Sequence, residues 1–447
     1  MKNLKSKIKY FVFILLLVPC LLVFTACGAS PSEKLAKDLG YSSVEEMLND
    51  LKGKDGKDGK DGADAPLLDT YEMWRQAVEN GEFDPNKSYM DFIRELNINS
   101  DNTSIVANKC VMSVVTVTAS STGGKSGSGV IYQISDDAAY IITNFHVVST
   151  DSLTGDRATK EYYVTLYGMD NTRVYATYLG GSASYDIAVL KVTNQSSLKI
   201  LKDANAQAAV FYDGDVKLGM SVLAIGNPRP ESWIYNISVS KGVVSVENEI
   251  VKISIAGQVS VIEEIRHDCY ITNGSSGGGL FNMNGELIGI TNGGAESSES
   301  INYAIPASTV LGVVRNVIKN CDGTKNNDKI IIFEPFEIQA SGISTSYNPH
   351  TGYVDLTQTI VISKVNENIS YSGLNVLKVG DVVIEASLNI SSQGVIQKYI
   401  TRSFHLERLL LNAQIGDTIT LKVMRAGTNE TINITIVLDD NIAHYLN

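Results

Sequence analysis

The chain has 447 residues, with 37 Lys and Arg against 49 Asp and Glu, and a formal net charge of −12. An acidic chain offers little basic surface to a polyphosphate, so nucleic acid is excluded as an expected partner. The length predicts two or three folded units.

The first 26 residues have the pattern of a secretion signal. Four lysines precede the apolar run YFVFILLLVPCLLVFTA, which ends in small residues directly before Cys27. The sequence FTAC resembles the lipobox of bacterial lipoproteins, which implies cleavage before Cys27 and a lipid thioether on its sulfur. An uncleaved anchor helix is the alternative. Because two acyl chains hold a protein stably at a membrane surface, we expect an extracytoplasmic, lipid-anchored protein.

Residues 27–102 have the pattern of a stalk. Two segments, EKLAKDLGYSSVEEMLNDLKG and YEMWRQAVENGEFDPNKSYMDFIREL, each predict a short helical hairpin. Between them lies GKDGKDGKDGADAP, whose glycines recur at every third position. That run is too short and too poor in proline for a collagen triple helix, so we expect a flexible charged spacer. Its aspartates do not have the spacing of a calcium loop, and no metal site is expected.

Residues 103–325 predict a mainly β unit. Short β-branched runs alternate with turn residues, and only Pro306 to Asn320 has a helical pattern. Within this unit, TNGSSGGGLF precedes LFNMNGELIGITN, which predicts a strand, an Asn284-Gly285 turn and a second strand. The glycine-rich stretch is therefore expected to be a fixed loop rather than a linker.

Residues 334–440 predict a third unit, of α+β class, with one convincing helix in RSFHLERLLLN. Beyond the predicted cleavage site and Cys27, the chain holds Cys110, Cys269 and Cys321. Three cysteines without close spacing imply no disulfide framework.

Two residues near predicted strands could activate a nucleophile. His146 is expected to close the apolar strand AYIITNFHVV, and Asp186 to open the strand YDIAVLKV. A serine hydroxyl attacks only when a base takes its proton, and a buried carboxylate holds that base in the right tautomer. The order His, Asp, then the serine-containing loop is one that catalytic triads use. Taken alone, a histidine after an apolar strand is more often structural.

The segments around these residues resemble one family, the HtrA-type (DegP-like) serine proteases. The matching segments span 103–325 and are GSGVIY, IITNFHVV, YDIAVLKV, AIGNP, GSSGGG and NYAIP. Farther on, SGLNVLKVGDVV and IGDTITLKVMRAG resemble a PDZ domain. The resemblance implies a chymotrypsin-like double β-barrel followed by an α+β PDZ-like domain, with no cofactor.

The resemblance also implies roles for particular residues. The family's loop GNSGGP is replaced here by GSSGGG, which places Ser276 as nucleophile with His146 as base and Asp186 as its orienting acid. The N–H groups of Gly274 and Ser276 would form the oxyanion hole. Gly279 replaces the family's proline, a change that loosens a loop entropically.

Specificity and regulation are expected from the same comparison. Ser275 precedes the nucleophile where trypsin-like zymogens need Asp, so activation by a newly cut N-terminus is not expected. Tyr270, six residues before Ser276, predicts cleavage after small or medium apolar residues, while the neighbouring His267 and Asp268 are expected to be structural or surface residues. The insertion STDSLTGDRATKE resembles a loop that reaches between subunits in that family, although a plain surface loop has the same pattern.

The PDZ-like unit would bind a peptide by strand addition, with Ser341 to Ser344 as the best candidate for the carboxylate-binding loop. Its helix contributes Phe404, Leu406, Leu409 and Leu410, most of which are expected to lie in the core.

Three functions follow as hypotheses. The first is an endopeptidase that cleaves misfolded or mislocalised proteins and binds C-terminal peptides, as a homo-trimer by resemblance. The second is a catalytically inactive surface scaffold protein. The third is a dedicated regulatory protease with a single substrate.

Overall fold

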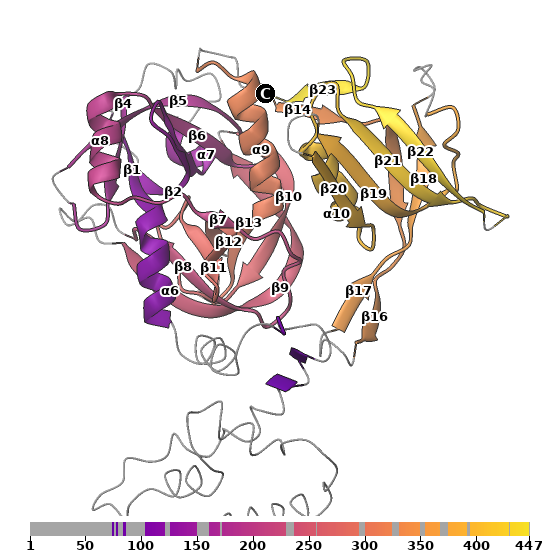
Figure 1. The fold of residues 1–447 in the computed structure, drawn as a ribbon, viewed down its shortest axis with the longest axis horizontal. Helices are drawn as coiled ribbons and strands as arrows, with labels where there is room; N and C mark the ends of the chain where they lie inside the picture. Colours follow the sequence, from indigo (N-terminus) through magenta and orange to yellow (C-terminus); the bar gives the residue numbers. More distant parts are fainter. Residues whose placement is uncertain are drawn as a thin grey trace, which may run out of the picture. The chain divides into compact units, whose positions relative to one another are not determined.

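The computed structural model describes residues 103–446 apart from short gaps, and six single positions between 74 and 85. The gaps are 121–125, 150–160, 170–171, 229–236, 256, 295–299, 324–329, 349–353, 367–373, 391–393 and 429. The predicted signal, Cys27, the two hairpins and spacer of the stalk and most of the insertion after Ser149 therefore lie outside the described residues. From Thr103 the chain forms one compact unit that extends to Asn447 (Figure 1).

Helix α6 (Thr103–Cys110) and a 3-10 turn at Val111–Ser113 lead into the first six strands, which form a closed barrel. Its strands, neighbours in the order β1-β2-β3-β6-β5-β4, have alternating apolar side chains that fill the interior. Their bounds are β1 Val114–Ser120, β2 Ser126–Ile134, β3 Ala139–Thr143, β4 Glu161–Leu166, β5 Val174–Ser182 and β6 Ile187–Val192. Helix α8 (Gln195–Asp203) follows, with the Asn194 side chain as its N-cap.

The second sheet has seven strands in the order β11-β8-β9-β10-β13-β12-β7, and pairing of β11 with β12 closes six of them into a ring. The predicted double β-barrel is thereby confirmed. The bounds are β7 Val210–Phe211, β8 Ser221–Gly226, β9 Ser238–Ile255, β10 Gln258–His267, β11 Gly279–Asn282, β12 Glu286–Gly294 and β13 Asn302–Pro306.

Two local predictions in this barrel are confirmed. β11 and β12 pair as an antiparallel hairpin around Gly285, whose φ of 79° needs glycine. The predicted helix after Pro306 is α9 (Ala307–Asn320), with Pro306 at its N-cap. Its buried valines pack into the core that both barrels share.

The C-terminal part has a separate core under a six-stranded sheet. The main order is β15-β18-β19-β21-β22, with β20 paired to β19; β14 pairs with β23, and β16 with β17. The bounds are β14 Ile330–Phe333, β15 Phe336–Ala340, β16 Ser344–Tyr347, β17 Val354–Thr357, β18 Ile360–Val365, β19 Val382–Ile390, β20 Gly394–Tyr399, β21 Thr418–Met424, β22 Thr431–Val437 and β23 Ala443–Leu446.

The predicted helix of this part is α10 (Ser403–Leu411). Leu406, Leu409 and Leu410 are buried in the core, as expected. Ser341 to Ser344 form an exposed stretch between β15 and β16.

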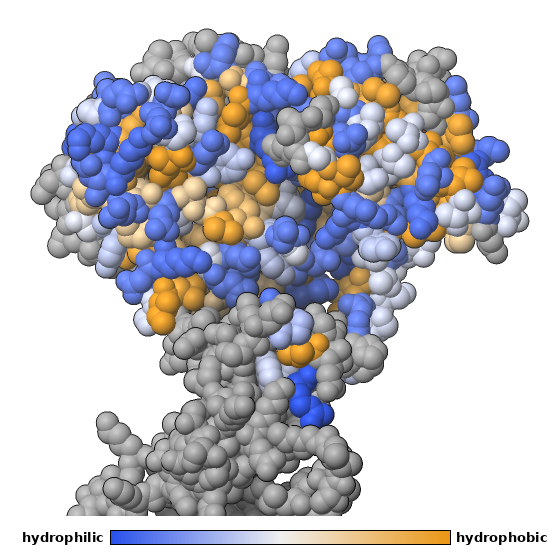
Figure 2. Space-filling model, viewed as in Figure 1, coloured by the Kyte–Doolittle hydropathy of each residue, from blue (hydrophilic) through white to orange (hydrophobic). Residues whose placement is uncertain are grey.

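The mixed hydropathy of the surface and the burial of the three cysteines are those of a folded globular unit. On the face shown in Figure 2, hydrophilic residues are interspersed among the hydrophobic ones. Cys110, Cys269 and Cys321 are buried free thiols. Burial raises the pKa of Cys110 to about 11 and that of Cys269 to about 12, which keeps both as unreactive thiols. Within the described part of the chain, no helix is long and apolar enough to span a membrane.

Candidate active site

The structure brings His146 and Asp186 together at the edge of the first barrel. Asp186 Oδ2 lies 2.7 Å from His146 Nδ1, and its other oxygen accepts the His146 backbone N–H at 2.9 Å. The Asp186 side chain is 1% exposed and that of His146 is 37% exposed. The carboxylate is therefore shielded while the imidazole is open to solvent, as a base that must meet a substrate requires.

One expectation about His146 was wrong. Strand β3 ends at Thr143, and His146 lies on the four-residue helix α7 (Phe145–Val148) instead of closing the strand. The backbone carbonyl of Asp186 accepts hydrogen bonds from Asn144 Nδ2 at 2.9 Å and from Phe145 N at 3.1 Å. Contacts with Asp186 thus hold the chain in this turn and override the extended pattern.

Asp186 has an unusual backbone conformation. Its φ of 51° lies in the left-handed region, which costs a non-glycine residue about 1 kcal/mol or more. The surrounding bonds hold it there, one residue before β6 begins at Ile187. Strain of this kind is tolerated where side-chain placement is functional.

The glycine-rich loop lies against the first barrel. The backbone N–H of Ser128 in β2 donates to the Ser276 carbonyl at 2.8 Å, and the Ser128 hydroxyl donates to the Gly274 carbonyl at 2.7 Å. There is no room for a side chain at Gly127, between Val147 and the Ser276 carbonyl. A Cβ there would lie 2.8 Å from a Val147 methyl carbon and 3.0 Å from that oxygen. Ser276 and the segment carrying His146 are therefore neighbours across the barrel interface.

Two glycines of the loop have conformations that other residues rarely adopt. Gly274 has φ 97° and Gly277 has φ 88°. A Cβ at Gly277 would lie 2.2 Å from the Ser128 carbonyl oxygen, so no side chain fits there. Glycine is needed in this loop because neighbouring backbone approaches it closely and because the loop has a fixed geometry.

The N–H groups of Gly274 and Ser276 donate to no group among the described residues, whereas Ser275 N, Gly277 N and Gly278 N all have backbone acceptors. Two free N–H groups beside a serine hydroxyl provide donors for a carbonyl oxygen that gains negative charge.

Gly279 belongs to the paired strand β11, where backbone pairing with Ile225 and Ile290 restrains it.

One residue that contacts the candidate nucleophile, and a second that contacts the first, were missed from sequence. Ser276 Oγ donates to the Asn292 carbonyl at 2.8 Å, and Asn292 Nδ2 donates to Glu264. Asn292 lies at a register shift between β12 and β13, and Glu264 lies beside one between β10 and β9. Glu264 is 1% exposed, and burial raises the pKa of its carboxyl to about 7. No sequence pattern marks either residue.

Tyr270, His267 and Asp268 are the residues that the sequence places near the primary specificity pocket. Tyr270 is 55% exposed and its N–H donates to Ser240 Oγ at 2.8 Å. His267 is fully buried, and Asp268 accepts a bond from Val243 N.

Among the described residues, no group of three or more His, Cys, Asp or Glu could hold a metal ion.

Comparison with known proteins agrees with this geometry. Residues 127–290 match the family model described as trypsin-like peptidase domain. The serine protease Do-like HtrA of Lactococcus lactis subsp. cremoris is 27% identical over 320 residues, covering 69% of this chain and 70% of that protein. The Bacillus subtilis protein of the same name is 29% identical over 323 residues, covering 70% of this chain and 63% of its own length.

A solved HtrA-type protease, AlgW with tripeptide, aligns with a TM-score of 0.44 at 22% identity, over 75% of this chain and 96% of that chain. The family match, the sequence relatives and the double barrel agree with a trypsin-like serine protease. The protein is therefore a serine endopeptidase that carries a trypsin-like peptidase domain and is similar to the HtrA proteases.

Proposed function

We propose that this endopeptidase cleaves misfolded or mislocalised proteins outside the cytoplasm by acyl transfer, while anchored through a lipid on Cys27. Ser276 attacks the scissile carbonyl, His146 takes the hydroxyl proton and returns it to the leaving amine, and Asp186 holds the imidazole. The N–H groups of Gly274 and Ser276 stabilise the oxyanion.

The observation that carries this mechanism is the 2.7 Å contact between His146 Nδ1 and Asp186 Oδ2. It orients the imidazole so that its other nitrogen, Nε2, can act as the base. For attack, the Ser276 hydroxyl must turn from the Asn292 carbonyl toward that nitrogen. Such a turn is a rotation between staggered side-chain positions.

The proposal is tested with Ser276→Ala. We expect this variant to lose casein cleavage and fluorophosphonate labelling while its unfolding midpoint stays that of the wild type. Ser275→Ala is the matched control from the same loop, because among the described residues Ser275 Oγ accepts a single long bond, 3.3 Å from Thr272 N. Wild-type protein that is neither labelled nor able to cleave an unfolded substrate would contradict the assignment.

A catalytically inactive scaffold is the second candidate. One observation favours it: the Ser276 proton is donated to a backbone carbonyl, not to a base. Labelling distinguishes the two functions, since a scaffold gives no labelling at any pH or with any added peptide.

A dedicated regulatory protease has the same site, so substrate range separates it from a quality-control enzyme. A regulatory protease would leave unfolded casein intact and cleave a small part of a peptide library.

In either case we propose cleavage after small or medium apolar residues. Strong preference for Lys or Arg at that position in library profiling would contradict this specificity.

The C-terminal unit is proposed to bind peptides as a PDZ-like domain. Strand β15 ends the main sheet order and, among the described residues, pairs only with β18, which would leave its other edge for an added strand; α10 belongs to the same core. Fluorescence polarisation with a peptide and its C-terminally amidated form tests this, because a carboxylate-binding loop discriminates between the two. Equal binding of both forms would contradict the proposal.

Membrane anchoring and a homo-trimer complete the proposal. Cys27→Ala should abolish incorporation of labelled palmitate and release the protein from membranes, and light scattering of the released protein gives its subunit number. Labelling that persists in this variant would contradict lipidation at Cys27.

A further inference from the structure

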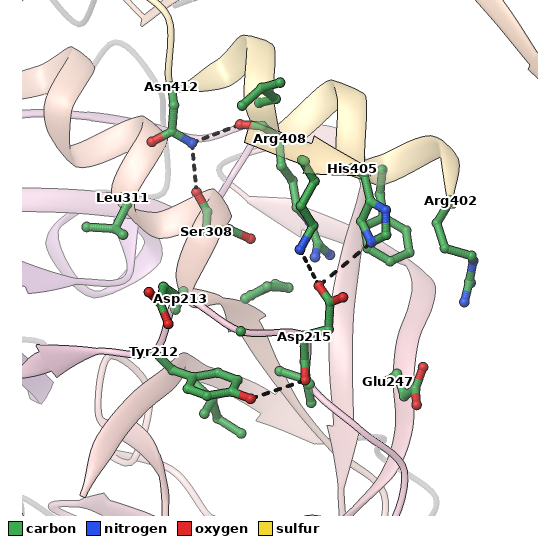
Figure 3. A pocket seen from close by; sticks show the side chains of 18 of the residues that line it. Tyr212, Asp213, Asp215, Glu247, Ser308, Leu311, Arg402, His405, Arg408 and Asn412 are labelled. Atoms are coloured by element: carbon green, nitrogen blue, oxygen red, sulfur yellow. Dashed lines mark hydrogen bonds and ion pairs between the residues drawn. The ribbon is translucent and has the colours of Figure 1, made fainter. Parts of the chain in front are cut away.

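A cavity of about 420 Å³ lies within the unit from Thr103 onward, where α10 and β20 face the protease domain. In Figure 3, His405 and Arg408 of α10 and Arg402 just before it lie on one side of the cavity, and Tyr212, Asp215 and Glu247 lie on the other. Its volume falls in the range of small-molecule sites, roughly 300 to 1,000 Å³. It is separate from Ser276, which does not line it.

Arg402 is the unusual member of the lining. It is 8% exposed, yet among the described residues its guanidinium donates no hydrogen bond and joins no ion pair. Its one recorded contact is with the Phe404 ring, 5.0 Å from Cζ to the centroid. A stacked ring leaves the in-plane N–H donors of a guanidinium unused. A buried cation with unused donors is costly unless an anion joins it.

The start of α10 adds to the positive potential at the same place. Arg402 is the N-cap residue of this nine-residue helix and provides no side-chain cap. The positive end of the helix dipole favours an anion there, although Ser403 N already donates to Gln358 Oε1 at 3.4 Å and His405 N to the Arg402 carbonyl at 3.2 Å. The helix dipole therefore adds to the positive potential of the wall that carries Arg402.

Most of the other charged side chains in the lining already have partners. Its cationic side chains outnumber its carboxylates by five to three: Lys217, Arg315, Lys398, Arg402 and Arg408 against Asp213, Asp215 and Glu247. Lys398 is already bound to Asp215, and Arg408 is paired with Glu263 at 3.4 Å. Lys217 lies 4.0 Å from Asp355, and Arg315 donates to Asn412 Oδ1 at 2.8 Å. His405 stays neutral, because burial lowers its pKa to about 4. Arg402 is the cation left for an incoming anion.

Apolar side chains form much of the rest of the wall. Leu311 of α9, Leu356 of β17 and Leu409 of α10 line the cavity, together with Val395 and Ile396 of β20. A simple inorganic anion would leave these surfaces uncovered. The walls are suited to an apolar body attached to the anionic group.

We propose that this cavity binds an amphipathic anion, in which one carboxylate or phosphate monoester is held by Arg402 at the start of α10 and an apolar chain lies against the leucine-lined wall. Because the lining comes from both the protease and the C-terminal parts, the bound molecule would hold the two together. The site does not depend on proteolysis and can be tested without it.

The test is calorimetric titration of the full chain with decanoate and decyl phosphate below their micelle concentrations, with decanol and decyltrimethylammonium as matched neutral and cationic probes. We expect saturable binding of the anions alone. Preference for decanoate or for decyl phosphate distinguishes a free fatty acid from a phosphate-bearing lipid as the source. Equal binding of decanol would overturn the proposal, and so would failure of both anions to bind.

Variants locate the site. Arg402→Gln should weaken anion binding about tenfold or more, the loss expected for one charge-assisted contact. Should that variant fold poorly, Val395→Glu adds a negative charge to the wall at a side chain that is 65% exposed, and it should weaken binding similarly. Val379→Glu, at an equally exposed valine outside the lining, is the control. Wild-type affinity in both lining variants would exclude this cavity.

Discussion

Ser276 donates its hydroxyl proton to the carbonyl oxygen of Asn292, 2.8 Å away. The Asn292 side chain in turn donates to the buried carboxyl of Glu264. The resting nucleophile is therefore held by a residue whose position depends on a titratable group. This relationship makes the site sensitive to a residue that has no part in the triad.

We expect Glu264 to make stability fall as pH rises. Burial, and then the charges of Asp186 and Glu249, raise its pKa from 4.5 to about 7, against a smaller lowering by the Asn292 bond. Because the folded-state pKa is raised, the stabilisation is complete below the unfolded value and is lost as pH rises through about 7. The full effect is up to about 3 kcal/mol.

Urea unfolding of the wild type and Glu264→Gln between pH 5 and pH 8 measures this effect. The amide keeps the shape and can still accept from Asn292, but it has no proton to lose. We expect the variant to gain stability relative to the wild type as pH rises. Parallel pH curves for the two proteins would show that Glu264 does not titrate in this range.

Asp186→Asn should lower kcat by about 10³ to 10⁴ while leaving the fold intact. The amide can donate to Nδ1 and so favours the wrong imidazole tautomer. Fluorogenic peptide hydrolysis measures the loss, with Asp203→Asn as the control, since the Asp203 side chain is 62% exposed. A loss below tenfold would mean that Asp186 does not orient the base.

The features that the sequence predicts best are those that depend on residues close together along the chain. The Asn284-Gly285 hairpin, α9 after Pro306 and α10 all follow local turn, cap and periodicity signals. His146 was expected to close a strand, and the structure corrects this because its turn is held by Asp186, 40 residues away. Asn292 and Glu264 meet through two irregular strand pairings, which no local pattern records.

Gly277→Ala should destabilise the protein by about 2 to 4 kcal/mol and abolish activity. It combines a φ of 88° with a Cβ position 2.2 Å from the Ser128 carbonyl oxygen, a backbone atom that cannot easily move. Gly168→Ala separates these causes, because Gly168 has φ 71° and nothing within 4 Å of the added carbon. We expect the control to lose only about 1 kcal/mol in urea unfolding. Equal losses would mean that backbone strain, not close approach, sets the cost.

Asn316→Leu should loosen the contact between the protease and C-terminal parts. Asn316 is fully buried in α9, where Nδ2 donates to the Leu411 carbonyl at 3.1 Å and Oδ1 accepts from Ile331 N at 3.0 Å. Leucine has a similar volume but leaves both backbone groups without partners, at a cost of about 2 to 4 kcal/mol. Because both groups belong to the C-terminal part, we expect calorimetry to show two thermal transitions where the wild type shows one. Asn320→Leu, which removes only bonds of 3.2 and 3.4 Å from a half-buried side chain, should keep the single transition. A single transition in Asn316→Leu would show that the two parts unfold together without this residue.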